Sequence, residues 1–394
     1  MNAITHPVEM QLSPSSRANG LDTLRAAAIA LVFMYHYMVF VSREPTFGWL
    51  STVGWVGVDL FFVLSGYLIA NQIFSGVAKR RQLSLAAFYA RRALRTLPVF
   101  WVMLALYFIF PAVMGGKTPP PLWTFLTFTQ NFNLPPGTAF SHAWSLCIEE
   151  QFYLLLPLVL VIGARLRGGV AQGWFALFAL LWLGIVARGI LWQDYGREAG
   201  GKISGYHPNI YYATLCRSDE FLPGVAVAML KNFHASLWAR ITQHGQRWLA
   251  TGVLATAVML ALVFNAYYID DYGYGFFMTT FGYSLVACAF AVLVVAALCP
   301  ASTLYRLRIP GAYQLALWSY SIYLSHKAIG FIVQTQLQPI APSSLLLLAT
   351  VTIASLVGGW LLYRVVEAPF MAIRKRRFPS SFASEAHREQ FVIS

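Results

Sequence analysis

Charged residues are scarce in this sequence. Asp, Glu, Lys and Arg make up 11% of its 394 residues, while 58% are hydrophobic; soluble domains carry about 25% charged residues. Acidic side chains are the scarcer kind, with 15 Asp and Glu against 28 Lys and Arg, for a formal net charge of +13. Because the deficit extends along most of the chain, an ordinary soluble domain is excluded. Most of the chain must lie in lipid or against other buried helices.

Cysteine is also sparse. The four cysteines, Cys147, Cys216, Cys288 and Cys299, lie in or at the ends of apolar segments. None has the spacing of a redox or metal motif, so we interpret them as structural thiols and predict no bound metal. Internal repeats are absent as well, so the sequence gives no support to an inverted-repeat transporter.

Apolar stretches of about 20 residues recur instead, and each is long enough to cross a bilayer core of about 30 Å. We therefore predict an all-α, polytopic bundle of about ten transmembrane helices. The predicted spans are Leu21–Val41, Val53–Phe74, Leu94–Met114, Ser145–Ala164, Gly173–Trp192, Ala213–Leu230, Trp248–Tyr267, Phe276–Leu298, Ala312–Val333 and Leu345–Val366.

Alternate loops between these spans are basic, and the others are poor in Lys and Arg. The basic set includes Lys79–Arg81 and Arg374–Arg377, whereas the loop Gln336–Ser343 has no charge. Cytoplasmic loops carry the basic excess in membrane proteins, so both termini are predicted to be cytoplasmic and no nucleic-acid partner is needed. We expect a disordered tail at 1–18, one transmembrane domain at 19–372 and a basic cytoplasmic tail at 373–394.

Ionisable residues inside spans are costly in lipid and tend to be functional. Arg25 and His36 are eleven residues apart, close to three helical turns, so they share one face about 16 Å apart along the axis. His36 can exchange protons near neutral pH. Asp59 in the second span is expected at about the depth of His36, where it could orient the imidazole. The alternatives are a buried neutral histidine and a structural ion pair of Asp59.

Paired charges occur in two further spans. Arg92 and Arg95 share a helical face, and planar guanidinium groups at a membrane mouth suit phosphates, although lipid headgroups offer the same chemistry. Glu149 and Glu150 enter the fourth span from its predicted outer end, with Tyr153 one turn below Glu149. They could perform acid–base chemistry, orient His36 or bind acceptor hydroxyls.

His326, in the ninth span, is also expected in the outer half, and Lys327 beside it indicates a polar cavity. Ser65 and Gly66 in the second span permit close helix packing. The arrangement predicts a polar path, with Arg25, Arg92 and Arg95 at its cytoplasmic mouth. Proton-handling groups lie at its other end: His36, Asp59, Glu149, Glu150 and His326.

On these residues the chain resembles the acyltransferase-3 family of bacterial membrane acyltransferases, over about Asn19 to Phe370. The motifs are Arg25 and His36 with ten residues between them, DLFFVLSGYL at Asp59–Leu68, the RxxR pair Arg92 and Arg95, WSLCIEEQFY at Trp144–Tyr153, SIYLSH at Ser321–His326 and VEAPF at Val366–Phe370. Each motif alone is weak, but their order on these spans is specific.

The resemblance implies a bacterial inner-membrane O-acyltransferase. It would move an acyl group, generally acetyl, from cytoplasmic acyl-CoA to a hydroxyl of an O-antigen, exopolysaccharide or similar glycan. The family assigns essential roles to residues matching His36 and Arg25, and associates the pair matching Arg92 and Arg95 with the donor. Ser65, Tyr153, His326 and Trp144 are expected to support the site. Some relatives carry a further domain after the last span, so direct transfer is expected here.

Three other functions stay open from the sequence. A proton-coupled secondary transporter would use the same acids and histidines as a proton relay. A non-catalytic partner or flippase for a glycolipid, and an acyltransferase that acts on a small molecule such as a macrolide, are the others. The sequence does not set the acceptor, the acyl chain length or the oligomeric state.

Overall fold

A computed structural model describes residues 19–165, 169–197, 205–340 and 343–382. Apart from one short hairpin, regular structure in these residues is helical, which confirms the predicted all-α bundle. The helices of the first half are α1 (Asn19–Tyr37), α2 (Trp49–Val53), α3 (Gly57–Ala78), α4 (Leu85–Ile109), α5 (Pro111–Met114), α6 (Leu122–Leu126), α7 (Trp144–Arg165) and α8 (Val170–Tyr195).

The second half contains α9 (Thr214–Arg217), α10 (Leu222–Phe233), α11 (Ala235–Gln243), α12 (Gly245–Ala266), α13 (Tyr283–Leu298), α14 (Thr303–Arg306), α15 (Ala312–Leu337), α16 (Ser344–Leu362) and α17 (Ala368–Arg377). The antiparallel hairpin of β1 (Tyr268–Ile269) and β2 (Gly273–Tyr274) lies between α12 and α13. Single π-helical turns extend α1 and α16 at Met38–Ser42 and Tyr363–Glu367.

Eight of the ten predicted spans coincide with helices that are long and apolar enough to cross a membrane. The other two are also helical. The sixth is divided into α9, a 3₁₀ turn at Ser218–Phe221, and α10, which has Pro223 in its first turn. The ninth is the 26-residue α15, whose polar residues Ser319–Lys327 face inward and are almost all buried. The polar side chains of these two segments therefore face the interior of the bundle.

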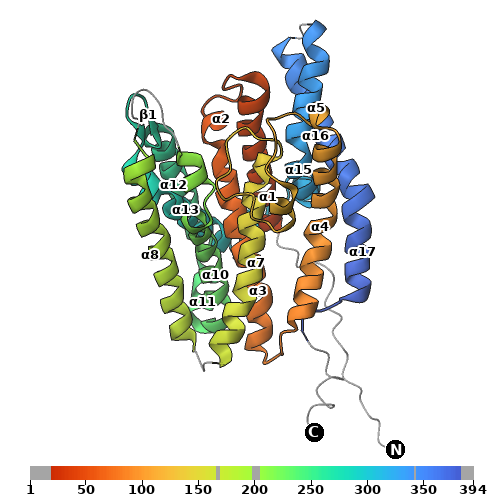
Figure 1. The fold of residues 1–394 in the computed structure, drawn as a ribbon. Coiled ribbons are helices and arrows are strands. Elements are labelled where there is room, and N and C mark those ends of the chain that lie inside the picture. Colours follow the sequence, from red (N-terminus) through yellow and green to blue (C-terminus); the bar gives the residue numbers. More distant parts are fainter. Residues whose placement is uncertain (1–18, 166–168, 198–204, 341–342, 383–394) are drawn as a thin grey trace, which may run out of the picture.

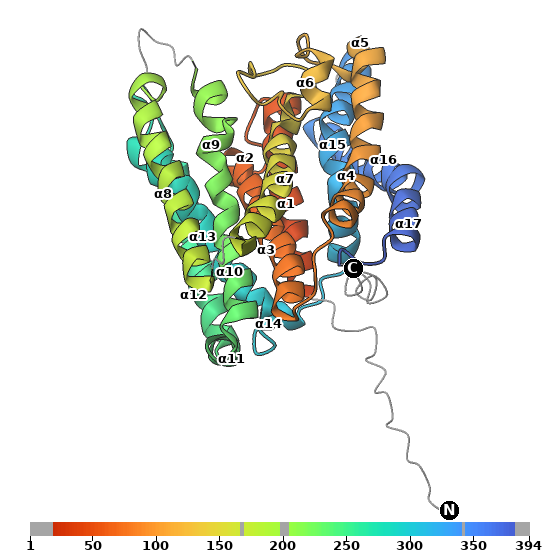
Figure 2. The ribbon, with the colours of Figure 1, turned by 60° about the horizontal axis from the view of Figure 1, so that its bottom comes forward.

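The buried centre of the bundle is α3, flanked by α1 and α7 (Figure 2). One group of helices, α8, α10, α12 and α13, lies on one side of it, and α4, α15, α16 and α17 lie on the other (Figure 1). Gly66 of α3 permits the close approach of the 3₁₀ turn before α10, because a Cβ at this position would lie 2.1 Å from the carbonyl oxygen of Phe221. The prediction of close packing is thus confirmed for Gly66.

The segment between α4 and α7 enters the bundle rather than staying at its surface. Ser141, His142 and Ala143 are buried, and Nε2 of His142 lies 3.3 Å from the carbonyl oxygen of Leu324, half-way along α15. Irregular backbone is tolerated at such depth where protein covers it. Consequently α7 begins half-way through the bundle, and not at the outer surface that the sequence suggested.

The basic residues Lys79–Arg81 follow the end of α3, and Arg374–Arg377 form the end of α17. Both ends lie at the lower side of the bundle in Figure 1, where α4 begins. Gly20 at the start of α1 packs against Ala297, near the end of α13, at this same side. The first described helix therefore begins, and the last one ends, on the basic side of the bundle, as the predicted even number of spans requires.

The structure describes the first ten residues of the segment predicted as a basic tail at 373–394, while the predicted tail at 1–18 lies outside the described residues. Helix α17 extends to Arg377, and the chain then packs back on α3 and α4. Ser84 N donates to the Ser381 carbonyl at 3.0 Å, and Gln72 Nε2 donates to Ser381 Oγ at 2.7 Å. The ring of Phe382 lies against Gly76. We call residues 378–382 the carboxyl-terminal strap.

Replacing Phe382 with alanine should release the strap. Partial burial of this ring contributes about 1 kcal/mol to the docking of the strap, which is roughly fivefold in the docking equilibrium constant. Trypsin should therefore cleave after Arg377 several times faster in Phe382→Ala. The measurement is limited proteolysis of the purified protein followed by mass spectrometry. Ile373→Ala, an exposed apolar change on α17, serves as the control, and equal cleavage rates in the two variants would contradict docking through Phe382.

Candidate active site

Two histidines from distant parts of the sequence meet between α1 and α15. Nδ1 of His36 lies 2.7 Å from Nε2 of His326, and the two rings are nearly parallel, at 10°. On its other side, Nδ1 of His326 lies 2.9 Å from the carbonyl oxygen of Ile322. His326 is buried, whereas His36 is partly exposed. The predicted position of both histidines in one polar region is therefore confirmed.

These contacts assign the proton positions of the neutral pair. A carbonyl oxygen can only accept, so Nδ1 of His326 donates to Ile322. The lone pair of His326 is then on Nε2, where it accepts from Nδ1–H of His36. Nε2 of His36 is left unprotonated, and in the described part of the chain it makes no hydrogen bond. His36 thus presents a basic nitrogen, and its partner is an imidazole rather than a carboxylate.

A third histidine completes this group, which we call the histidine cluster. The ring of His142 lies 6.1 Å from that of His36 and 5.8 Å from that of His326, edge-on to both. Its Nε2 donates to the Leu324 carbonyl, while its buried Nδ1 has no partner among the described residues. We had not singled out His142, although its place beside the WSLCIEEQFY motif was a usable signal.

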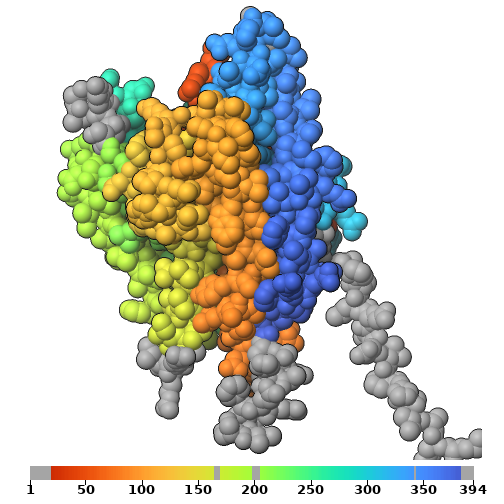
Figure 3. All heavy atoms as spheres, turned by 45° about the vertical axis from the view of Figure 1, so that its right-hand side comes forward, coloured from red at the N-terminus to blue at the C-terminus, as the bar shows by residue number. Residues whose placement is uncertain are grey.

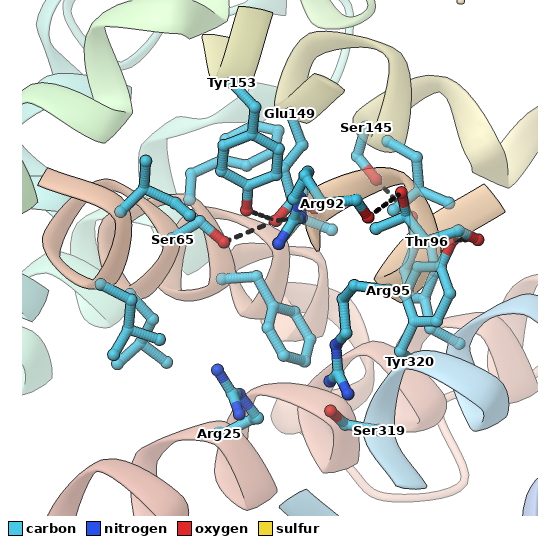
Figure 4. A pocket seen from close by; sticks show the side chains of 18 residues that line it. Arg25, Ser65, Arg92, Arg95, Thr96, Ser145, Glu149, Tyr153, Ser319 and Tyr320 are labelled. Carbon is cyan, nitrogen blue, oxygen red and sulfur yellow. Dashed lines mark hydrogen bonds and ion pairs between the residues drawn. The ribbon is translucent and has the colours of Figure 1, made fainter. Parts of the chain in front are cut away.

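A cavity of about 120 Å³ lies below this cluster, lined by three arginines from two helices (Figure 4). We call it the arginine pocket: Arg25 comes from α1, and Arg92 and Arg95 come from α4. Arg95 Nη1 pairs with Glu367 Oε1 at 2.5 Å. Arg25 has no hydrogen bond or ion pair within the described ranges, and Figure 4 shows it opposite Arg95 across the pocket. The predicted gathering of the three arginines is confirmed.

The two glutamates lie beside these arginines and not beside His36. Glu149 Oε1 is 3.3 Å from Arg92 Nη2, and Glu150 Oε1 is 3.5 Å from Arg92 Nε. Glu149 also accepts hydrogen bonds from Ser65, at 2.6 Å, and from the Tyr153 hydroxyl. The prediction that they reach the outer half is therefore wrong. The physical reason is that α7 begins half-way through the bundle, which places its second turn near the basic side.

Asp59 is also placed differently from our prediction. It is fully buried in an ion pair with Arg217, which in turn binds Glu220. A Cβ on Gly57 would meet the backbone of Ala28, so this part of α3 is level with Ala28 and not with His36. Eight residues of helix separate these levels, or about 12 Å. Asp59 therefore has the structural ion pair that the sequence left as its alternative.

Trp144 belongs to the same buried region. Its ring lies 5.1 Å from the Arg217 guanidinium carbon, and it packs against Tyr211 and Tyr212. Trp144 therefore packs within the bundle and does not line the arginine pocket. Lys327 donates to Ser141 Oγ at 3.1 Å, which fixes the buried segment that carries His142. The lysine thus holds a wall of the histidine cluster rather than opening a cavity.

Tyr323 connects the arginine pocket with the histidine cluster. It lines the pocket, and its ring is 5.7 Å from His142 and 6.1 Å from His326. Its hydroxyl donates to the His142 carbonyl at 2.6 Å and contacts Ser145 Oγ at 2.6 Å. Tyr323 thus lies between the arginine pocket, which it lines, and two members of the histidine cluster.

The described residues thus form a bundle with several helices long and apolar enough to cross a membrane, and it holds a basic histidine above a cation-lined pocket. A family model described as an acyltransferase domain matches residues 18–364. The chain therefore belongs to this acyltransferase-3 family.

Among its relatives, YrhL of Bacillus subtilis is 29% identical and aligns with 92% of this chain and 55% of its own length. The peptidoglycan O-acetyltransferase OatA of Listeria monocytogenes is 26% identical, with 94% and 58% covered. The O-acetyltransferase OatA of Staphylococcus aureus is 26% identical, with 95% and 60% covered. The chain thus spans less than two thirds of the length of these relatives. No solved structure matches it.

Proposed function

We propose that the protein is an O-acetyltransferase that moves an acetyl group from acyl-CoA to a hydroxyl of a cell-envelope glycan. The observation that carries the proposal is the unpaired Arg25 in a pocket lined by Tyr323, whose ring packs beside the histidine cluster that contains the base His36. An uncompensated guanidinium forms strong charge-assisted hydrogen bonds, and the carbonyl oxygens of a CoA thioester arm can accept them. Family membership supports acyl transfer, and the names of two relatives support acetyl as the acyl group.

The size of the arginine pocket favours the donor over the acceptor. A cavity of about 150 Å³ holds a single benzene molecule, so 120 Å³ suits a narrow chain but not a sugar. We place the thioester arm of the donor there, with its acyl end toward Tyr323. The acceptor then approaches His36, which is partly exposed, from the side away from the arginine pocket.

In the proposed reaction, His36 acts as the general base. Its Nε2 takes the proton of the acceptor hydroxyl while the hydroxyl oxygen attacks the thioester carbonyl. The carbon–sulfur bond breaks, the thiolate leaves, and the proton passes from His36 to the thiolate. Atoms and charge balance without a metal or a further reactant. The hydrogen bond to His326 keeps the proton of neutral His36 on Nδ1, so that Nε2 of His36 remains basic.

A peptidoglycan sugar is the first acceptor to test, because one relative is named for acetylating peptidoglycan. The site lies in a membrane that we take to be the bacterial inner membrane, with CoA on the basic, cytoplasmic side. The decisive assay uses purified protein in lipid vesicles, radiolabelled acetyl-CoA and peptidoglycan or other envelope-glycan fragments. Label in an alkali-labile ester is the expected result. Proton-coupled uptake without any acyl-CoA, and no label transfer, would establish a transporter instead.

Arg25→Gln tests the donor pocket directly. Loss of a charge-assisted hydrogen bond to an oxygen of the thioester arm costs roughly 1.5–3 kcal/mol, so we expect the KM for acetyl-CoA to rise roughly 10- to 100-fold. Arg240→Gln, an exposed change on α11, is the matched control and should leave KM unchanged. Steady-state kinetics at varied acetyl-CoA concentration is the measurement. An unaltered KM in correctly folded Arg25→Gln protein would remove Arg25 from the donor site.

A further inference from the structure

A second opening lies on the basic side of the arginine pocket. Gln72, Arg91, Arg92, Arg95 and Arg374 line it. Arg92 and Arg95 also line the arginine pocket, so the two spaces are neighbours that share these side chains. We call the second opening the mouth site.

The charges around the mouth site do not balance. Four guanidinium groups face it, and no carboxylate stands among its described lining residues. Arg92 and Arg95 have glutamate partners, but Arg91 donates only to the backbone carbonyl of Phe378. The Nε of Arg374 is buried and has no hydrogen-bond partner in the described ranges. Like charges held this close are unfavourable unless an anion joins them.

The walls of the mouth site are fixed by packing. Helices α4 and α17 lie side by side along one face of the molecule (Figure 3), so Arg91 and Arg374 come from adjacent helices. The carboxyl-terminal strap completes the wall, because Phe378 binds Arg91 and Ser381 binds Gln72, which itself lines the site. A ligand would thus find its donor groups already positioned, at a reduced entropic cost.

We propose that the mouth site binds the diphosphate group of the donor, with Arg374 and Arg91 as its specific ligands. This inference rests on the proposed function. Guanidinium groups bind phosphate oxygens in a bidentate manner, and two adjacent phosphates use more donors than one carboxylate could. An elongated donor would then place its diphosphate in the mouth site and its thioester arm in the arginine pocket. Arg92 and Arg95 border both parts.

The binding test uses inorganic pyrophosphate and the full chain in nanodiscs of zwitterionic lipid, followed by calorimetry. The unmodified protein should bind pyrophosphate, and Arg374→Gln should weaken this binding roughly tenfold or more. Arg376→Gln, an exposed change on the same helix, should bind like the unmodified protein. Equal affinity in both variants, or no binding by the unmodified protein, would overturn the proposal. Matched thermal midpoints of the variants exclude a folding defect.

Two further arms identify the ligand and separate this proposal from the proposed function. The first uses S-acetyl-N-acetylcysteamine, a phosphate-free thioester. The ratio of kcat/KM for acetyl-CoA to kcat/KM for this thioester should fall at least tenfold in Arg374→Gln. An unchanged ratio would overturn the donor assignment. If anionic lipid abolishes pyrophosphate binding, the occupant is a lipid headgroup, which also overturns it. Pyrophosphate binding that depends on Arg374, without acetyl transfer from either thioester, would refute the proposed function but leave the anion site in place.

Discussion

His36→Ala should lower acetyl transfer by roughly 10²- to 10⁴-fold, the range expected for loss of a general base. Binding of acetyl-CoA should be retained, because His36 does not line the arginine pocket. Radiolabel transfer and donor binding, measured on the same preparation, give both quantities. His244→Ala changes an exposed histidine outside the cluster and should be fully active. Normal transfer by His36→Ala would refute the proposed mechanism.

Variants of His326 distinguish the proposed tautomer from simple packing. His326→Gln keeps an amide oxygen that can accept from Nδ1–H of His36, whereas His326→Leu keeps volume but no acceptor. We therefore expect kcat to fall strongly in the leucine variant and to recover in part in the glutamine variant, at an unchanged KM for the donor. Equal kcat values for the two variants would show that His326 has no positioning role.

Arg217→Met should destabilise the protein by roughly 3–5 kcal/mol, because it leaves Asp59 and Glu220 as uncompensated buried charges. Arg217 is fully buried, and its guanidinium carbon also lies 4.2 Å from the centre of the Tyr283 ring. The thermal midpoint in detergent, or the fraction of monodisperse protein, measures the loss. Arg43→Met, an exposed change outside the network, is the control and should have little effect.

Removing the charges together should restore much of this loss. Asp59→Asn and Glu220→Gln, combined with Arg217→Met, leave no unpaired ion in the interior, and buried ion pairs are often replaceable in this way. The triple variant should therefore be more stable than Arg217→Met alone. If instead Asp59→Asn alone folds normally and loses acetyl transfer, then Asp59 has the catalytic role that the sequence first suggested.

The sequence by itself determined the class of fold and the family. Long apolar segments have few stable alternatives to helices in lipid, because every backbone polar group must be satisfied internally. The alternation of basic and neutral loops then predicted an even number of spans. Arg25, Arg92 and Arg95 could be grouped in advance, since all three lie within the first eleven residues of helices that begin on the basic side.

The tertiary structure alone decided which charges are partners. His36 and His326 are 290 positions apart, and no helical periodicity links their rotations or heights. Glu149 was placed at the wrong depth because periodicity gives the direction of a side chain but not the level at which its helix begins. That level is set by the buried segment around His142, which packs against the middle of α15. Asp59 likewise binds Arg217 because the contact of Gly57 with Ala28 sets the register of α3 against α1.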